Sequence, residues 1–140
     1  MTNWSFVGLM VVAGALIAFQ SPINAALARG VGVLEASFVS FVIGALVATV
    51  VVAFFGKGHL SEVAQVPWWQ LVGGALGMIY VTLIVVSVAR IGVTAVMVAG
   101  LVGQLSTAMI IDHYGWFGVV TRPINAVTPI LATLTTISVT

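Results

Sequence analysis

Long apolar stretches separated by short polar turns dominate the chain. They cover residues 4–28, 34–55, 68–89, 93–111 and 122–140. A helix needs roughly 20 apolar residues to cross the hydrocarbon core of a membrane, and the first four stretches meet that length. The fifth is rich in threonine and contains Pro129, yet threonine hydroxyls can bond to the preceding turn of a membrane helix. The pattern predicts five membrane-spanning helices.

Helices explain the stretches better than strands do. Strands of a membrane barrel alternate with a period of 2, whereas runs such as residues 47–53 are continuously apolar. Pro67, Trp68 and Trp69 lie at the start of the third stretch. They support a helix there, since proline suits a first helical turn and tryptophan suits the headgroup level. We therefore expect an all-α integral membrane protein, with residues 1–140 forming a single transmembrane domain.

Composition supports a lipid environment and excludes several function classes. The chain is 61% hydrophobic and 5% charged, against about 25% charged residues in a soluble domain. The net charge of +1 gives no basic field for nucleic acid, and the absence of cysteine excludes disulfides and thiolate ligands. The N-terminal stretch lacks a basic region and is longer than a signal peptide core, so we interpret it as a retained first span.

The basic residues are balanced across the predicted membrane. One side holds the N-terminus and the loops after the second and fourth stretches, with Lys57 and Arg122; the other side holds Arg29 and Arg90. An excess of such residues normally fixes the cytoplasmic side. Either a weak bias elsewhere sets one orientation, or the chain inserts both ways. Two opposed copies would then pair with the geometry of the inverted repeats in many transporters.

The first stretch contains Gln20, Pro22 and Asn24. Pro22 is expected to disturb the helix one turn earlier, near Ala18. A broken helix with amides nearby is one way to line a binding cavity. The alternative is that both amides bond to the freed carbonyls or to a neighbouring helix.

Three further polar residues are candidates for a substrate site. Glu35, near a small and partly polar stripe in the second stretch, could bind a cation or exchange a proton, or could simply face the headgroups at a helix N-terminus. Tyr80 could line a cavity, stack on a substrate or pack, and Gln104 must find a partner inside the membrane. The predicted substrate-binding residues are Gln20, Asn24, Glu35, Tyr80 and Gln104.

Small residues and polar loop residues have simpler explanations. Helix packing explains the close spacing of Gly73 with Gly77 and of Gly100 with Gly103 better than a direct substrate role does. Asp112 and His113 lack a nucleophile and are too few for a metal site, so we expect them to cap a helix end. No cofactor, metal or enzyme motif is present in the sequence.

Several motifs together resemble one transporter family. They are residues 73–81 after Pro67-Trp68-Trp69, residues 103–105 followed by 110–115, Gln20…Ile23-Asn24…Leu27, and Ser40-Phe41…Gly44. This combination resembles the YdcZ-like family of bacterial inner-membrane proteins, within the drug/metabolite transporter superfamily. The resemblance implies five spans per chain and an antiparallel pair of ten helices with inverted symmetry, similar to the small multidrug resistance proteins.

These observations predict a small-molecule transporter that works as an antiparallel, dual-topology homodimer by alternating access. Its expected partners are the lipid bilayer, a second inverted copy of itself and a neutral or singly cationic organic substrate, with Glu35 as a candidate for proton coupling. Three alternatives stay open. The chain could form a passive channel, pair with an oppositely oriented homologue, or act as a membrane assembly protein that transports nothing.

Overall fold

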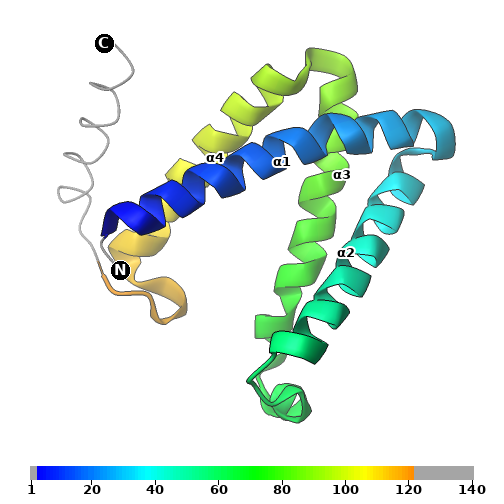
Figure 1. Ribbon diagram of the computed structural model, residues 1–140. Coiled ribbons are helices and arrows are strands. Elements are labelled where there is room, and N and C mark those ends of the chain that lie inside the picture. The colour runs from blue at the N-terminus through cyan, green and yellow to red at the C-terminus, as the bar shows by residue number, and fades with distance from the viewer. Residues whose placement is uncertain (1–2, 122–140) are drawn as a thin grey trace. The chain divides into compact units, whose positions relative to one another are not determined.

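The computed structural model describes residues 3–121, and all regular secondary structure in this part of the chain is helical (Figure 1). Four long helices follow one another: α1 (Asn3–Val31), α2 (Val33–Phe55), α3 (Gly73–Ile91) and α4 (Val93–Tyr114). Short 3-10 helices lie in the connections: η1 (Leu60–Gln65), η2 (Trp68–Val72) and η3 (Trp116–Gly118). The expectation of an all-α protein is confirmed for the described residues.

Four segments are long and apolar enough to cross a membrane. They are Trp4–Val31, Val33–Phe55, Trp68–Ile91 and Val93–Tyr114. Each of the first four predicted stretches therefore coincides, within a few residues, with a helix that is long and apolar enough to span a membrane. In the third, Trp68 and Trp69 begin a 3-10 segment, and the α-helix itself starts at Gly73. The fifth predicted span, residues 122–140, lies outside the described residues.

The described residues divide into two compact units, 3–96 and 97–121. In the first unit α1, α2 and α3 all contact one another. α1, drawn in blue, meets α2 at a tight turn and crosses α3, which runs alongside α2 (Figure 1). The second unit contains α4 from Met97 onward and the connection that follows it. The first unit contains the polar residues that sequence patterns singled out in the first three spans.

Single glycines join consecutive helices at two places. Gly32 lies between α1 and α2 with φ 100° and ψ 160°, and Gly92 lies between α3 and α4 with φ 80° and ψ 167°. Only glycine adopts this region readily. The N–H of Gly92 bonds to the carbonyl of Val88 at 3.1 Å, and its own carbonyl accepts from Val96 at 3.3 Å. The backbone hydrogen bonds at this turn are therefore satisfied.

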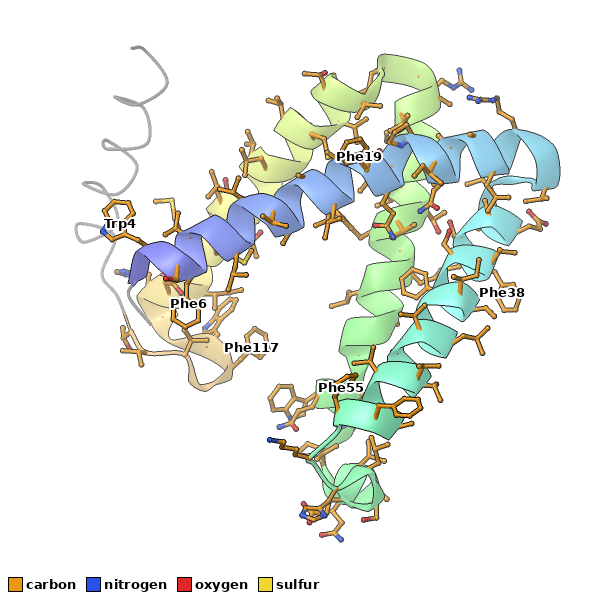
Figure 2. All side chains as sticks on the ribbon, viewed as in Figure 1. Trp4, Phe6, Phe19, Phe38, Phe55 and Phe117 are labelled. Carbon is orange, nitrogen blue, oxygen red and sulfur yellow. The ribbon has the colours of Figure 1, made fainter. Side chains whose placement is uncertain are left out.

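The core of the first unit is small and lies near these two turns, at what we call the turn end. Its buried residues, which combine small and polar side chains with a few aliphatic ones, are Ser21, Asn24, Ala25, Ala36, Ser37, Ile84, Val85 and Val96. Large apolar side chains instead project outward, as Phe19, Phe38 and Phe55 do in Figure 2. This inversion of the soluble pattern is expected when lipid is the solvent.

The predicted break at Pro22 is wrong. α1 continues as an α-helix from Asn3 to Val31 with Pro22 inside it. A membrane helix tolerates proline because neighbouring helices and local adjustments satisfy the freed backbone groups. The polar residues around Pro22 therefore lie on a continuous helical face and not at a break.

Candidate functional site at mid-span

A pocket of about 280 Å³ lies between α1 and α3, beside α2. We call it the central pocket. It is lined by Ile17, Gln20, Ser21, Asn24, Phe41, Gly77, Tyr80, Val81 and Ile84. Its lining contains amide, hydroxyl and phenol groups on an otherwise apolar wall, and no acidic or basic side chain.

Helical periodicity explains which side chains line this pocket. On α1, Ile17, Gln20, Ser21 and Asn24 follow the spacing i, i+3, i+4 and i+7. Residues at this spacing share one face of a helix. The lining residues of α3, from Gly77 to Ile84, follow the same spacing. The site is therefore formed by two regular helix faces that meet.

The pocket lies close to the middle of the spans. Ile17 is midway between Trp4 and Val31, and Tyr80 is midway between Trp68 and Ile91. In α2 the midpoint is Gly44, which lines a second pocket of about 350 Å³. This α2 pocket shares Gln20, Phe41 and Val81 with the central pocket. The two cavities therefore adjoin one another.

Polar contacts join the three helices on the turn-end side of the pocket. The hydroxyl of Ser40 on α2 donates to Oδ1 of Asn24 on α1 at 2.7 Å. The hydroxyl of Thr82 on α3 lies 3.0 Å from that of Ser37 on α2, and 2.9 Å from the carbonyl of Met78. Asn24 is 6% exposed and Ser37 is fully buried. Such bonds hold membrane helices together because an unpaired polar group in lipid is costly.

Ser21 is the exception among these polar residues. It is 2% exposed, and its hydroxyl has no hydrogen-bond partner in the described part of the chain. Buried hydroxyls are normally paired, so an unpaired one calls for an explanation. Ser21 lines the central pocket, although its hydroxyl oxygen is itself covered by neighbouring atoms. Sequence reasoning missed Ser21, although its spacing from Asn24 could have indicated the shared face.

The structure brings three of the five predicted substrate residues together. Gln20, Asn24 and Tyr80 all line the central pocket. Asn24 also bonds to a neighbouring helix, as the alternative interpretation of the amides expected. Gln104 lies on α4 in the second unit and is not among the lining residues. Its predicted role in binding stays a prediction.

Glu35 lies apart from the pocket. It is exposed in the first turn of α2, and its carboxylate folds back over Gly32. A carboxylate in the first turn is stabilised by the partial positive charge of a helix N-terminus. This position matches the structural interpretation of Glu35 more closely than a role in contacting substrate.

The predicted packing glycines have different surroundings. A side chain added at Gly77 would place its Cβ 3.4 Å from the ring of Phe41 on α2, which is an ordinary van der Waals contact, so α3 lies close to α2 at this glycine. A Cβ at Gly73 or at Gly103 would have nothing within 4 Å in the described residues. Packing roles for these two, and for Gly100, remain predictions.

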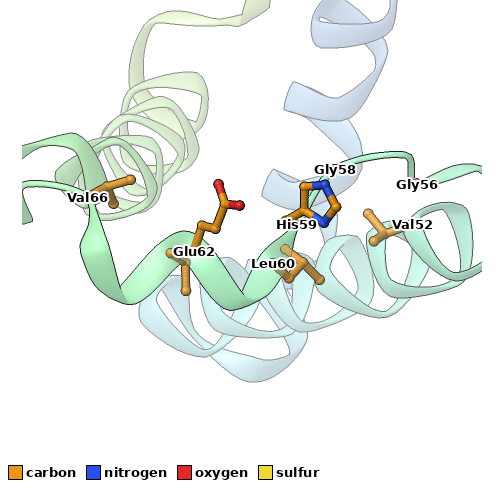
Figure 3. A pocket seen from close by; sticks show the side chains of 8 residues that line it. Val52, Gly56, Gly58, His59, Leu60, Glu62 and Val66 are labelled. Carbon is orange, nitrogen blue, oxygen red and sulfur yellow. The ribbon is translucent and has the colours of Figure 1, made fainter.

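A separate pocket of about 560 Å³ lies in the connection after α2 (Figure 3). His59 and Glu62 are among its lining residues, together with Val52, Leu60 and Val66. Two possible ligands are too few for a structural metal site, and no group of three metal-ligating side chains occurs in the described chain. Apart from Val52 near the end of α2, its lining residues belong to the connection between the second and third spans.

Aromatic rings cluster where α4 ends. His113 and Tyr114 meet edge to face with ring centroids 4.9 Å apart, and Tyr114 stacks on Trp116 at 5.8 Å. Aromatic side chains gather in this way at the membrane–water interface. Asp112 and His113 lie in the last turn of α4, and their predicted capping role stays a prediction.

Comparison with known proteins identifies the family of the chain. The family model described as "Putative inner membrane exporter, YdcZ" matches residues 5–140. No curated protein and no solved structure matches the chain. The match extends over nearly the whole chain and includes every residue of the central pocket. The chain therefore belongs to the YdcZ family of inner-membrane exporters and is a multi-pass inner-membrane protein.

Proposed function

We propose that this chain exports a small organic molecule and that the central pocket binds it. The observation that supports this most directly is a mid-span pocket with polar but uncharged lining residues in a chain of an exporter family. Transporters bind substrate near the bilayer midplane, where both sides of the membrane are equally distant. A few directed polar groups on an apolar wall are typical of small-molecule sites.

The proposed working form is an antiparallel homodimer. Lys57 and Arg122 on one side balance Arg29 and Arg90 on the other, so the positive-inside rule gives neither orientation an advantage. Two opposed copies would supply equivalent pockets related by an axis in the membrane plane, and rocking between them would give alternating access. Gln104 stays a candidate residue for cargo binding in this assembly.

Proton coupling is the part of this proposal that depends on Glu35. Glu35 is the single acidic residue in α1, α2 and α3. Because it lies at a helix end and not in the pocket, it would act through the α1–α2 turn and not by contacting cargo. A Glu35→Gln exporter that keeps the wild-type response to a pH gradient would remove Glu35 from this role.

The transport proposal is tested in liposomes that contain the purified protein. We expect saturable movement of a neutral or singly cationic solute from a broad panel. Conductance that neither saturates nor responds to gradients would indicate a passive channel. Failure to move any solute under any ion gradient would contradict the proposal and favour an assembly role.

The topology proposal uses the absence of native cysteine. Single cysteines at positions 59 and 91 should both be labelled from outside intact cells if the chain inserts both ways. Labelling at one position alone would contradict dual topology and favour an oppositely oriented homologue as partner. Adding one lysine beside Ile91 should shift a dual-topology chain toward one orientation.

A further inference from the structure

The lining of the central pocket also indicates the chemical class of the cargo. We infer that the central pocket binds an uncharged molecule with a carbonyl-type acceptor, held by the hydroxyl of Ser21 against the rings of Phe41 and Tyr80. The ligand is the exported cargo only if the proposed function holds, so this inference rests on that proposal. The binding site itself depends only on the residues that line the central pocket.

The first step concerns charge. The nine lining residues include no Asp, Glu, Lys, Arg or His. A charged ligand at mid-span would lose its hydration and gain no counter-ion from this lining, and such burial is strongly unfavourable. The acidic residues nearest in sequence lie elsewhere, because Glu35 folds over Gly32 and Glu62 lines the loop pocket. The proposal of a neutral or singly cationic substrate is thereby narrowed to a neutral one.

The second step concerns hydrogen bonding. The hydroxyl of Ser21 is unpaired in the described structure, and leaving such a group unpaired in a low-dielectric interior costs free energy. Its O–H can turn toward the pocket by rotation about Cα–Cβ between ordinary rotamers. Asn24 accepts a hydrogen bond from Ser40 through Oδ1, and its amide N–H₂ can donate to a ligand. A ligand acceptor would satisfy such donors.

The third step concerns size and shape. A volume of about 280 Å³ lies just below the usual range of about 300–1,000 Å³ for drug-sized ligands. It equals roughly nine water molecules at about 30 Å³ each. The lining contains the aromatic rings of Phe41 and Tyr80 and the flat backbone surface of Gly77. A compact ring with one acceptor suits this space.

The test uses four probes of similar size and different chemistry: benzamide, benzoate, benzylammonium and toluene. Each is added to the purified full chain in nanodiscs, and the rise in melting temperature gives its affinity. We expect benzamide to bind most tightly, ahead of both ions and of toluene. Equal or tighter binding of benzylammonium, or no stabilisation by benzamide, would overturn the inference.

Two buried serines provide a matched pair of variants. Ser21→Ala should weaken benzamide binding about three- to tenfold, the usual value of one neutral hydrogen bond, while leaving toluene binding and the ligand-free melting temperature unchanged or higher. Ser37→Ala should leave benzamide binding unchanged and lower the ligand-free melting temperature. Ser37 forms hydrogen bonds in the helix contacts and does not line the pocket. Benzamide binding that is unchanged in Ser21→Ala would overturn the role of the hydroxyl.

Binding and transport outcomes separate the two proposals. Selective benzamide binding without flux in liposomes would support the proposed binding site and contradict the proposed export function. Flux of cations without selective benzamide binding would retain export and reject the inferred cargo class.

Discussion

The two ends of the α2–α3 pair differ in a way that explains how this protein is held together. At the turn end, near Gly32 and Gly92, the helices bury serine, alanine and asparagine, and hydrogen bonds cross between them. Toward the loop that follows α2, every residue from Phe41 to Phe55 is exposed, with Phe54 at 79%. The most apolar part of α2 is therefore the part that the first unit leaves uncovered.

The difference follows from the solvent. Lipid tails are as apolar as leucine or phenylalanine, so burying those side chains against protein gains little. Small residues allow backbones to approach, and polar groups must find partners because lipid offers none. The helix contacts therefore form where small and polar residues lie, and the apolar face of α2 is free to meet lipid or a second copy.

The largest effect on stability is expected at the glycine turn. Gly92→Ala would force a side chain into φ 80° and should destabilise the protein by about 1–3 kcal/mol. Gly74→Ala, at the other end of α3, meets nothing within 4 Å and should stabilise it by up to about 1 kcal/mol. Denaturant unfolding followed by tryptophan fluorescence measures both. Equal effects would show that the turn conformation is not required.

A smaller effect is expected from the bond between α1 and α2. Asn24→Ala and Ser40→Ala each remove one partner of the 2.7 Å contact. A double-mutant cycle should give a coupling energy of about 0.6–1.7 kcal/mol, the range found for hydrogen bonds between membrane helices. Free energies that add within about 0.3 kcal/mol would indicate that the contact contributes nothing.

The smallest effect on the free energy of unfolding is expected from two threonines that make similar local hydrogen bonds. Thr82 and Thr49 each donate to a carbonyl four residues earlier, at 2.9 Å and 2.8 Å, but only Thr82 also contacts Ser37. Thr82→Val should cost about 0.5–1 kcal/mol, whereas Thr49→Val, on the exposed half of α2, should change the free energy of unfolding by less. A larger loss at Thr49 would contradict the contrast between the two ends.

Sequence patterns predicted the spans well because a span requires only length and apolar composition. They identified Gln20, Asn24 and Tyr80 as site residues because polar side chains are conspicuous in apolar helices. They did not indicate that α1 continues through Pro22, since that depends on how the neighbouring groups accommodate the helix. They also missed Ser21 and Phe41, because serine and phenylalanine are ordinary in membrane helices until the opposite wall of the pocket is known.

Glu35 illustrates a second limit of sequence patterns, which concerns the boundary between two helices. An acid beside an apolar stretch attracts a functional interpretation, yet its position three residues after Gly32 places it in the first turn of α2. The distinction between a helix end and a binding site depended on where α1 stops and α2 begins. Apolar runs alone do not define that boundary within one residue.

The central claim, that the mid-span pocket binds the exported molecule, is tested most directly by filling it. Gly77→Leu places a large side chain in the pocket beside Phe41, whereas Gly73→Leu, four residues earlier on α3, adds the same side chain where nothing lies within 4 Å. Gly77→Ala serves as an intermediate, and thermal unfolding confirms that each variant folds. The account predicts that Gly77→Leu lowers saturable flux in liposomes about tenfold or more while Gly73→Leu retains it. A folded Gly77→Leu protein with wild-type flux would contradict the account.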